Sequence, residues 1–313
     1  MAILISGSLA HDYIMDFPGR FRDHILPEKI HILNVAFSIE TFKKQFGGTA
    51  GNIAYTLKLL GGNPIVLAPL GKDGWDYISR FEALGINTKH MPVLESDFTS
   101  SAHIVTDQDD NQITAFHGGI AKEAAKLSLD EIKEKIEFAI LSPAYSDAMV
   151  LHARECVARA IPFVFDPGQQ ISALSAEQIN QCLDGAAFFV SNDYELALLL
   201  KKIELSKEGL LARVPTIITT FGAKGSMIMT RQETLSVPAC VVTTVADPTG
   251  AGDAYRAGFF FAHTRGLPLG DCARIGSVAA SFTVETYGTQ EHTFTLDTFR
   301  ARFTEQYASA CPI

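Results

Sequence analysis

Residues 247–253 read Asp-Pro-Thr-Gly-Ala-Gly-Asp and are the part of the chain best suited to chemistry. Glycines let a backbone turn tightly and bring bare N–H groups close to a ligand. A helical pattern begins at the same point, and a helix start adds unpaired N–H groups and the positive end of the helix dipole. We therefore expect Gly250, Ala251 and Gly252 to form an anion-binding turn, with Asp253 as a proton acceptor at its rim. Transfer of a phosphoryl group to a hydroxyl requires this combination.

A second glycine-rich segment, residues 46–54, contains Gly47, Gly48 and Asn52 in front of another helical pattern. An Asn side chain both donates and accepts hydrogen bonds, which suits the hydroxyls of a polyol. The alternative is a helix start that Asn52 caps. The segment around Asp253 has a similar alternative, a glycine turn before a helix with an acidic first turn.

Further polar residues follow predicted strands. Ser8 and Asp12 come after the first strand, and Asp12 can accept two hydrogen bonds from vicinal hydroxyls or support a turn. Gln169 and Gln170 close a segment that follows another strand. Since α/β sheets bind ligands where strands end, we expect these residues at one sheet edge.

Two motifs are candidates for binding a nucleotide. Asn192 and Glu195 lie about one helical turn apart after a strand, where Glu195 can hold Mg²⁺ through water. The alternative is a helix cap with acids in its first turn. Residues 219–225 read Thr-Thr-Phe-Gly-Ala-Lys-Gly and resemble a glycine loop for phosphates. No G-x-x-x-x-G-K-[ST] occurs in the chain, so any ATP binds without a P-loop.

Short apolar runs alternate with amphipathic stretches, which predicts a parallel α/β sheet covered by helices on both faces. The predicted strands are residues 3–6, 65–70, 138–141, 163–165, 188–190 and 217–219. The predicted helices are residues 52–60, 75–84, 148–160, 176–183 and 194–201, two long helices within 254–287, and a closing helix at 296–307. The single tryptophan, Trp75, is expected to be packed.

Two inserted segments, about residues 10–46 and 96–117, break this rhythm. Within the second, residues 101–106 and 112–116 are predicted strands around a polar turn. We expect the inserted strands to form a small sheet across one edge of the main domain, as a lid or a dimer contact. The alternative is two ordinary surface excursions.

Composition limits the class of protein and its partners. A chain of 313 residues with 47% hydrophobic and 19% charged residues is typical of a globular protein, with one large domain or one domain with a smaller appendage. Its net charge of −9 argues against nucleic acid as the main partner. The N-terminus does not resemble a signal peptide, and no run is long enough for a membrane helix. Five scattered cysteines indicate a reducing compartment, so we expect a cytoplasmic protein.

Taken in order, these motifs resemble the ribokinase-like (PfkB) carbohydrate kinase family over nearly the whole chain. The resemblance implies a single ribokinase-like domain over residues 1–313, with a mostly parallel sheet, helices on both faces and a small β-sheet lid. It also implies an ATP-dependent kinase. Within the family, the chain is most similar to bacterial adenosine kinases through Gly7-Ser8…Asp12, residues 17–21, Leu26-Pro27, Asp166-Pro…Gln169-Gln170, Asp247-Pro-Thr-Gly250 and Gly288-Thr-Gln290.

The resemblance also implies residue roles. Asp253 is the general base for the nucleoside 5′-hydroxyl, and Gly250, Ala251 and Gly252 line the anion hole. Phe116 on the lid stacks against the base. The other substrate-binding residues are Ser8, Asp12, Gly47, Gly48, Asn52, Gln169 and Gln170. ATP contacts fall to Asn192, Thr220, Gly222 and Gly225. Glu195 organises Mg²⁺, and Asp247 and Thr249 lie where the family often binds a monovalent cation such as K⁺.

The chain also departs from the family pattern. Pro248 stands where the signature usually has Thr, and it is expected to stiffen the loop. The group that neutralises the moving phosphate is not identified: it is the metal, Arg256 or no side chain. For Phe116 the alternative is a core residue under the lid.

Three other functions remain as alternatives. A PfkB-type kinase for ribose, fructose, inosine or guanosine is the nearest of them. A nucleoside-binding regulator without turnover is a second. A dinucleotide dehydrogenase is disfavoured because no G-x-G-x-x-G follows the first strand.

Overall fold

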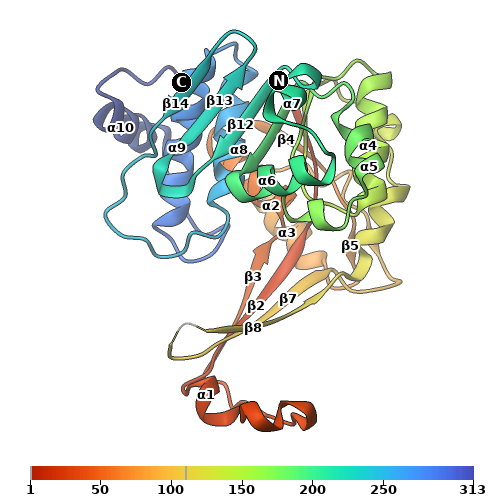
Figure 1. The fold of residues 1–313 in the computed structure, drawn as a ribbon, viewed down its shortest axis with the longest axis vertical. Helices are drawn as coiled ribbons and strands as arrows, with labels where there is room; N and C mark the ends of the chain where they lie inside the picture. The colour runs from red at the N-terminus through yellow and green to blue at the C-terminus, as the bar shows by residue number, and fades with distance from the viewer. Residues whose placement is uncertain (1, 110) are drawn as a thin grey trace.

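The computed structural model describes residues 2–109 and 111–313. Within them, the main sheet has eight strands in the order β14-β13-β12-β11-β10-β9-β1-β4 (Figure 1). The first six along the chain are parallel: β1 (Ala2–Ser6), β4 (Asn63–Leu67), β9 (Ile136–Leu141), β10 (Phe163–Phe165), β11 (Phe188–Asn192) and β12 (Thr216–Thr220). The antiparallel strands β13 (Ser226–Thr230) and β14 (Thr234–Val237) complete one edge.

Helices cover both faces of this sheet because its strands are apolar on both sides. Neighbouring residues of β1 show the alternation: Ile3 and Ile5 pack into one core, and Leu4 packs into the other. The first core is closed by α2 (Thr49–Leu59), α3 (Trp75–Ala83), α8 (Ala251–His263), α9 (Leu269–Val284) and α10 (Leu296–Tyr307). The second is closed by α4 (Ser146–Ala158), α5 (Ala176–Leu183), α6 (Asp193–Lys202) and α7 (Lys207–Arg213).

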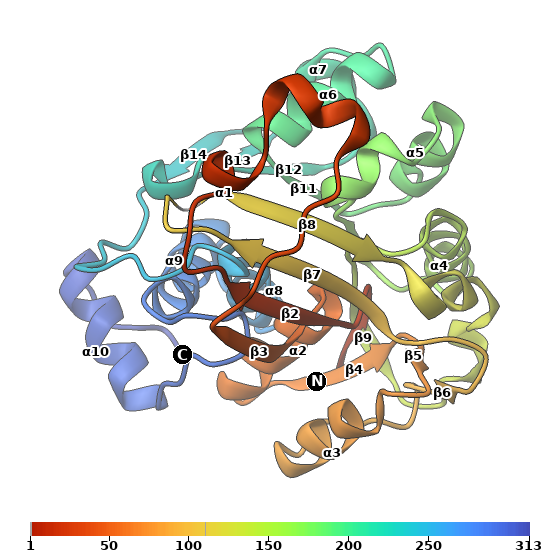
Figure 2. The same cartoon turned by 90° about the horizontal axis from the view of Figure 1, so that it is seen from below.

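A separate four-stranded sheet projects from the main body (Figure 1) and crosses in front of it when viewed from below (Figure 2). Its order is β3 (Thr41–Gly47), β2 (Ala10–Asp16), β7 (Ser100–Thr106) and β8 (Gln112–His117). Helix α1 (Phe21–His24) and the 3₁₀ turn η1 (Pro27–Ile32) lie in the connection between β2 and β3. We call these four strands the small sheet.

Short elements complete the described chain. β5 (Leu70–Gly71) pairs with β6 (Val93–Leu94). The remaining 3₁₀ turns are η2 (Gly119–Lys126), η3 (Leu129–Glu131), η4 (Gly168–Ser172) and η5 (Gly222–Lys224). Among the residues that the structure describes, no helix combines the length and apolar character needed to cross a membrane.

The predicted fold class is confirmed: a mostly parallel α/β sheet with helices on both faces and a small separate sheet. Two details differ from the prediction. The run 65–70 is divided between β4 and β5, and the β13–β14 hairpin was not foreseen. The prediction that Trp75 is packed is wrong, since it is 60% exposed. Trp75 is the first residue of α3, whose inward face consists of Tyr77, Ile78 and Phe81.

Candidate active site

Helix α8 begins at the predicted glycine turn. Gly250 is its N-cap, with a left-handed backbone (φ 79°) that glycine adopts without strain. Asp253 lies in the first turn, and its Oδ2 accepts a hydrogen bond of 2.8 Å from Nδ2 of Asn52. Residues 201 positions apart therefore meet, and the two glycine motifs form one site.

Helix α2 begins at the second motif, and Gly48 is its N-cap with φ 86°. The Gly48 backbone lies so close to the chain at Ser8 and Ala10 that a Cβ would be 2.5 Å from the Ser8 carbonyl oxygen. Ser8 Oγ accepts a hydrogen bond from the backbone N–H of Thr49 at 3.1 Å. Asn52 is buried inside the helix, so the alternative in which Asn52 caps it is wrong.

A compact set of charges surrounds Asp253. Burial raises the pKa of Asp253 and Glu195 adds to the rise, whereas Arg256 and the hydrogen bond from Asn52 oppose it. A carboxylate with a raised pKa is a stronger proton acceptor, as a general base requires. Arg256 is buried and pairs with Asp166, which follows β10.

The carboxylate of Asp12 lies directly beside Gly47. A Cβ on Gly47 would be 2.4 Å from Asp12 Oδ2. Burial, followed by repulsion from Asp247, raises the pKa of Asp12 to about 6. Asp12 and Asp247 are thus close enough to interact, although they lie on β2 and in the loop before α8. Above pH 6 Asp12 is an acceptor for hydroxyl groups.

A cavity of about 310 Å³ opens beside the ends of β1, β9 and β10, within the size range of small-molecule sites. Four of the predicted substrate residues line it: Ser8, Phe116, Gln169 and Gln170. Phe116 is 69% exposed, so the alternative in which it is a core residue is wrong. Thr49, next to Gly48, also lines the cavity and links it to the start of α2.

The predicted nucleotide residues lie at the carboxyl ends of β11 and β12. Asn192 and Glu195 form a reciprocal capping box at the start of α6, as the structural alternative predicts. Glu195 N–H donates to Asn192 Oδ1 at 2.7 Å, and Asn192 N–H donates to Glu195 Oε2 at 2.9 Å. Thr220 ends β12, and Gly222 and Gly225 follow with positive φ. Their roles toward ATP remain predictions.

Asp247 ties the loop before α8 to a neighbouring loop. Its Oδ1 accepts from the Thr249 N–H at 2.9 Å, and its Oδ2 accepts from the Gly288 N–H at 3.1 Å. Carboxylate oxygens keep further lone pairs for a cation. Across residues 2–109 and 111–313, no three His, Cys, Asp or Glu side chains are grouped to hold a metal ion.

Residues 19–295 match the model of the pfkB family carbohydrate kinases. The chain belongs to the PfkB family of carbohydrate kinases. This PfkB kinase is 33% identical over 297 residues to the nucleoside kinase of Methanocaldococcus jannaschii, with 93% of each chain covered. The Burkholderia thailandensis nucleoside kinase in complex with inosine has a TM-score of 0.88 and 36% identity, with 98% and 99% coverage. The same enzyme in complex with ADP-inosine has a TM-score of 0.87 and 36% identity, with 99% and 97% coverage.

The family prediction and the ribokinase-like fold are therefore confirmed. The finer resemblance to adenosine kinases remains a prediction.

Sequence motifs did not identify Gln290 and Tyr77 as residues of the PfkB kinase site. Gln290 Nε2 donates to Asn52 Oδ1 at 3.1 Å and to Tyr77 Oη at 2.7 Å. Tyr77 Oη donates in turn to the Gly47 carbonyl at 2.8 Å. These bonds orient the Asn52 amide so that its Nδ2 faces Asp253. Gln290 lies in the Gly-Thr-Gln stretch of the resemblance, whereas Tyr77 carries no sequence signal.

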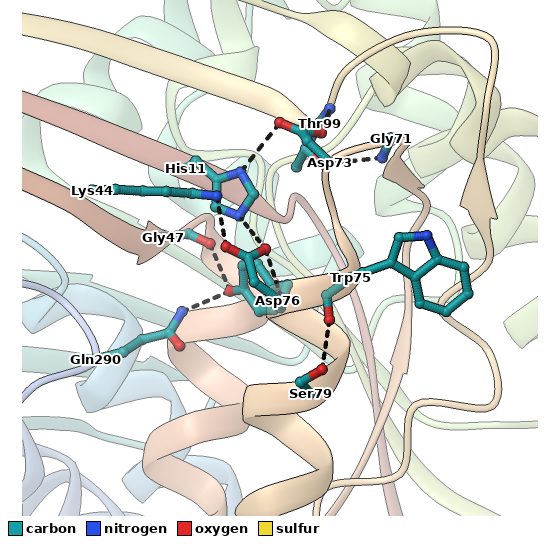
Figure 3. Close-up of polar contacts among 11 residues, drawn as sticks. His11, Lys44, Gly47, Gly71, Asp73, Trp75, Asp76, Ser79, Thr99 and Gln290 are labelled. Carbon is teal, nitrogen blue, oxygen red and sulfur yellow. Dashed lines mark hydrogen bonds and ion pairs between the residues drawn. The ribbon is translucent and has the colours of Figure 1, made fainter.

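A charged cluster joins the small sheet of this kinase to α3 (Figure 3). His11 is fully buried, with its Nδ1 3.7 Å from Asp73 Oδ2 and its Nε2 3.3 Å from Asp76 Oδ1. Lys44 Nζ donates to Asp76 Oδ2 at 2.6 Å, and Thr99 N–H donates to Asp73 Oδ1 at 2.7 Å. Burial and Lys44 lower the pKa of His11, against the attraction of both carboxylates. The cluster fixes the base of the small sheet beside Asp12.

Proposed function

We propose that this PfkB kinase transfers the γ-phosphoryl group of ATP to the 5′-hydroxyl of a nucleoside. The observation that carries the proposal is the Asn52–Asp253 contact, which places a carboxylate of raised pKa at a glycine turn. The adjacent cavity, with exposed Phe116 at its wall, suits an aromatic base. The nucleoside kinases of Methanocaldococcus jannaschii and Burkholderia thailandensis, the latter with inosine bound, support the same substrate class.

Asp253 accepts the 5′-hydroxyl proton while that oxygen forms a bond to the γ-phosphorus of ATP. The bond from the γ-phosphorus to the bridging oxygen breaks, and ADP leaves with that electron pair. The backbone N–H groups of Gly250 and Gly252 stabilise the charge on the transferred group, and that of Ala251 joins them when it leaves the Pro248 carbonyl, to which it donates at 3.2 Å. Asn52, oriented by Gln290, holds Asp253 toward the acceptor.

The nucleotide is expected to contact Asn192, Thr220, Gly222 and Gly225. Mg²⁺, when bound with ATP, offsets the phosphate charge. Glu195 is suited to hold Mg²⁺ through a water molecule. The Asn192 N–H holds its Oε2 in place, and its negative charge raises the pKa of Asp253, so the carboxylate lies close to the proposed site of transfer. K⁺ at Asp247 and Thr249 remains a prediction, supported by the carboxylate that organises this loop.

Substrate contacts are expected on both sides of Asp253. Asp12, Gly47, Gly48 and Asn52 are expected to hold the ribose. Ser8, Gln169 and Gln170 line the cavity beside them. A Gln amide both donates and accepts hydrogen bonds, so it can pair with a 6-amino or a 6-oxo purine. Adenosine, converted to AMP as in purine salvage, remains our predicted substrate, and inosine is the second.

Two predictions concern the setting of the enzyme. A homodimer through the small sheet is supported by exposed apolar side chains there, including Phe42 and Ile113. A cytoplasmic location is supported by the cysteines, each unpaired in the described part of the chain.

Release of ADP should be measured with adenosine, inosine, guanosine, ribose and fructose at saturating MgATP. We expect the highest kcat/KM with a purine nucleoside. If ribose or fructose exceeds every nucleoside, the protein is another PfkB-type sugar kinase. If nucleosides bind and ADP release stays at the background rate, the protein is a binding regulator.

Phe116→Ala tests the role of the small sheet as a lid over the base. Stacking is worth ~1–3 kcal/mol per base, so we expect the nucleoside KM to rise roughly tenfold while the ATP KM is unchanged. Phe42→Ala is the matched control, because Phe42 is similarly exposed on the same sheet but does not line the cavity. Equal changes in both KM values would remove Phe116 from the nucleoside site.

The pKa of Asp12 makes nucleoside binding depend on pH. Its pKa of about 6 means that the carboxylate is ionised above pH 6 and protonated below it. We therefore expect the nucleoside KM to be constant above pH 7 and to rise roughly tenfold per unit below pH 6. Asp12→Asn should raise the KM at pH 7.5 and abolish this dependence. A KM of the unaltered enzyme that is constant from pH 5 to 7.5 contradicts the assignment.

A further inference from the structure

The side chain of Arg256 occupies the space beside the anion-binding turn. Helical side chains lean toward the helix N-terminus, so Arg256, one turn after Gly252, reaches back along α8. A Cβ on Gly252 would be 2.6 Å from Arg256 Nη1. The absence of a side chain at Gly252 therefore leaves room for the guanidinium next to the turn. Arg256 is 7% exposed, so solvent screens its charge only weakly.

Asp166 anchors this guanidinium from the end of β10. Asp166 Oδ1 accepts a hydrogen bond of 2.8 Å from Arg256 Nη2, and Asp166 Oδ2 forms an ion pair with Arg256 Nε. Two-point contact of this kind fixes the plane of the guanidinium as well as its position. The third nitrogen, Nη1, is left on the side of Gly252.

Arg256 is the cation that three carboxylates of the site share. Burial lowers the pKa of Arg256, but Asp166, Asp253 and Glu195 outweigh burial and raise it, so the guanidinium stays charged. The attraction is mutual, and Arg256 lowers the pKa of Asp253 against the effect of burial. A buried ion pair adds little net stability compared with apolar residues of similar size. The Asp166–Arg256 pair therefore matters more for the shape and charge of the turn at Gly252 than for the stability of the fold.

We propose that Arg256, anchored by Asp166, is a positioning residue for phosphoryl transfer: it shapes the turn at Gly252 and supplies the positive charge beneath it. The inference rests on the proposed function. The charge acts in two ways, keeping Asp253 ionised as a base and adding to the helix dipole where the transferred group gains negative charge.

Arg256→Met removes the charge and keeps much of the side-chain length. We expect kcat to fall by about 100-fold, as for loss of one preorganised donor, with little change in the nucleoside KM. Activity requires ionised Asp253, so it is lost as pH falls through the pKa of Asp253. Without Arg256 that pKa rises, and the acidic limb of the kcat profile should move to higher pH. Arg256→Lys should recover part of kcat, since it restores charge without the two-point contact.

The double variant Asp166→Asn/Arg256→Met separates this role from folding, because it leaves no unpaired charge in the interior. We expect it to fold, as judged by circular dichroism and Tm, and to remain at least about tenfold slower than the unaltered enzyme. Arg213→Met is the matched control, since Arg213 forms an ion pair of 2.6 Å with Asp184, and this pair joins the C-terminal ends of α7 and α5 at the sheet edge opposite the site. It should leave kcat and the pH profile unchanged.

The inference is overturned if either the folded Arg256→Met variant or the double variant keeps kcat within about threefold of the unaltered enzyme. An acidic limb unchanged in Arg256→Met also overturns it. These failures differ from failure of the proposed function, in which the unaltered enzyme itself phosphorylates no nucleoside.

Discussion

Asp253→Asn is expected to lower kcat by about 10³-fold, within the 10²–10⁴ typical of a general base. The amide has nearly the same shape as the carboxylate but cannot take the 5′-hydroxyl proton. Asp253 lies at the start of α8 and contacts Asn52, where an amide oxygen can accept the same hydrogen bond. The fold and ATP binding should therefore persist, as checked by Tm and by calorimetric titration with ATP.

Asp271→Asn is the matched control for this variant. Asp271 occupies the first turn of the next helix, α9, and pairs with Arg274 on the surface. Asp271 is the third residue of its helix, as Asp253 is, but it lies outside the site. The Asp271→Asn variant should therefore keep the kcat of the unaltered enzyme. Turnover of Asp253→Asn close to that of the unaltered enzyme would show that another group accepts the proton.

Gly48→Ala is expected to have the second largest effect, on stability and on nucleoside binding together. At φ 86° an alanine is strained, and its Cβ would lie 2.5 Å from the Ser8 carbonyl and 2.7 Å from the Ala10 nitrogen. Both obstacles are backbone, so α2 must move away from β1 and β2. Backbone strain of 1–3 kcal/mol and overpacking of similar size suggest a loss on the order of 4 kcal/mol in the free energy of unfolding.

Gly61→Ala separates strain from crowding. Gly61 follows the other end of α2 at φ 80°, with nothing within 4 Å of the Cβ position. It should cost only about 1–2 kcal/mol for the left-handed backbone and leave the nucleoside KM unchanged. Urea unfolding of the two variants, together with their KM values, tests the comparison. Equal losses of stability would mean that the contact at Ser8 is not tight.

The parts of the site that sequence predicts are those encoded locally. Glycines directly before a helical pattern predict the turn at Gly250 and the start of α8, because both depend on neighbouring residues. The same holds for Asn192 and Glu195, whose three-residue spacing matches the capping box observed. Their spacing alone does not distinguish a cap from a ligand contact, since either function uses the same side chains.

Contacts between distant segments are much harder to predict. The Asn52–Asp253 contact spans 201 positions, and only the family resemblance suggested that the two residues share a site. Arg256 and Asp166 were each singled out in the sequence, but nothing in their types or spacing predicts that they pair, because they lie 90 positions apart. Tyr77 was hidden for a related reason: its ring packs in the core while its hydroxyl reaches Gly47.

The exposed position of Trp75 has a practical consequence. It is the only tryptophan of the chain, and it precedes Asp76, which contacts both His11 and Lys44 of the small sheet. Indole emission responds to local polarity, so the protein carries a native fluorophore at the joint between α3 and the small sheet. Rearrangement of that joint can be followed optically in the unlabelled enzyme.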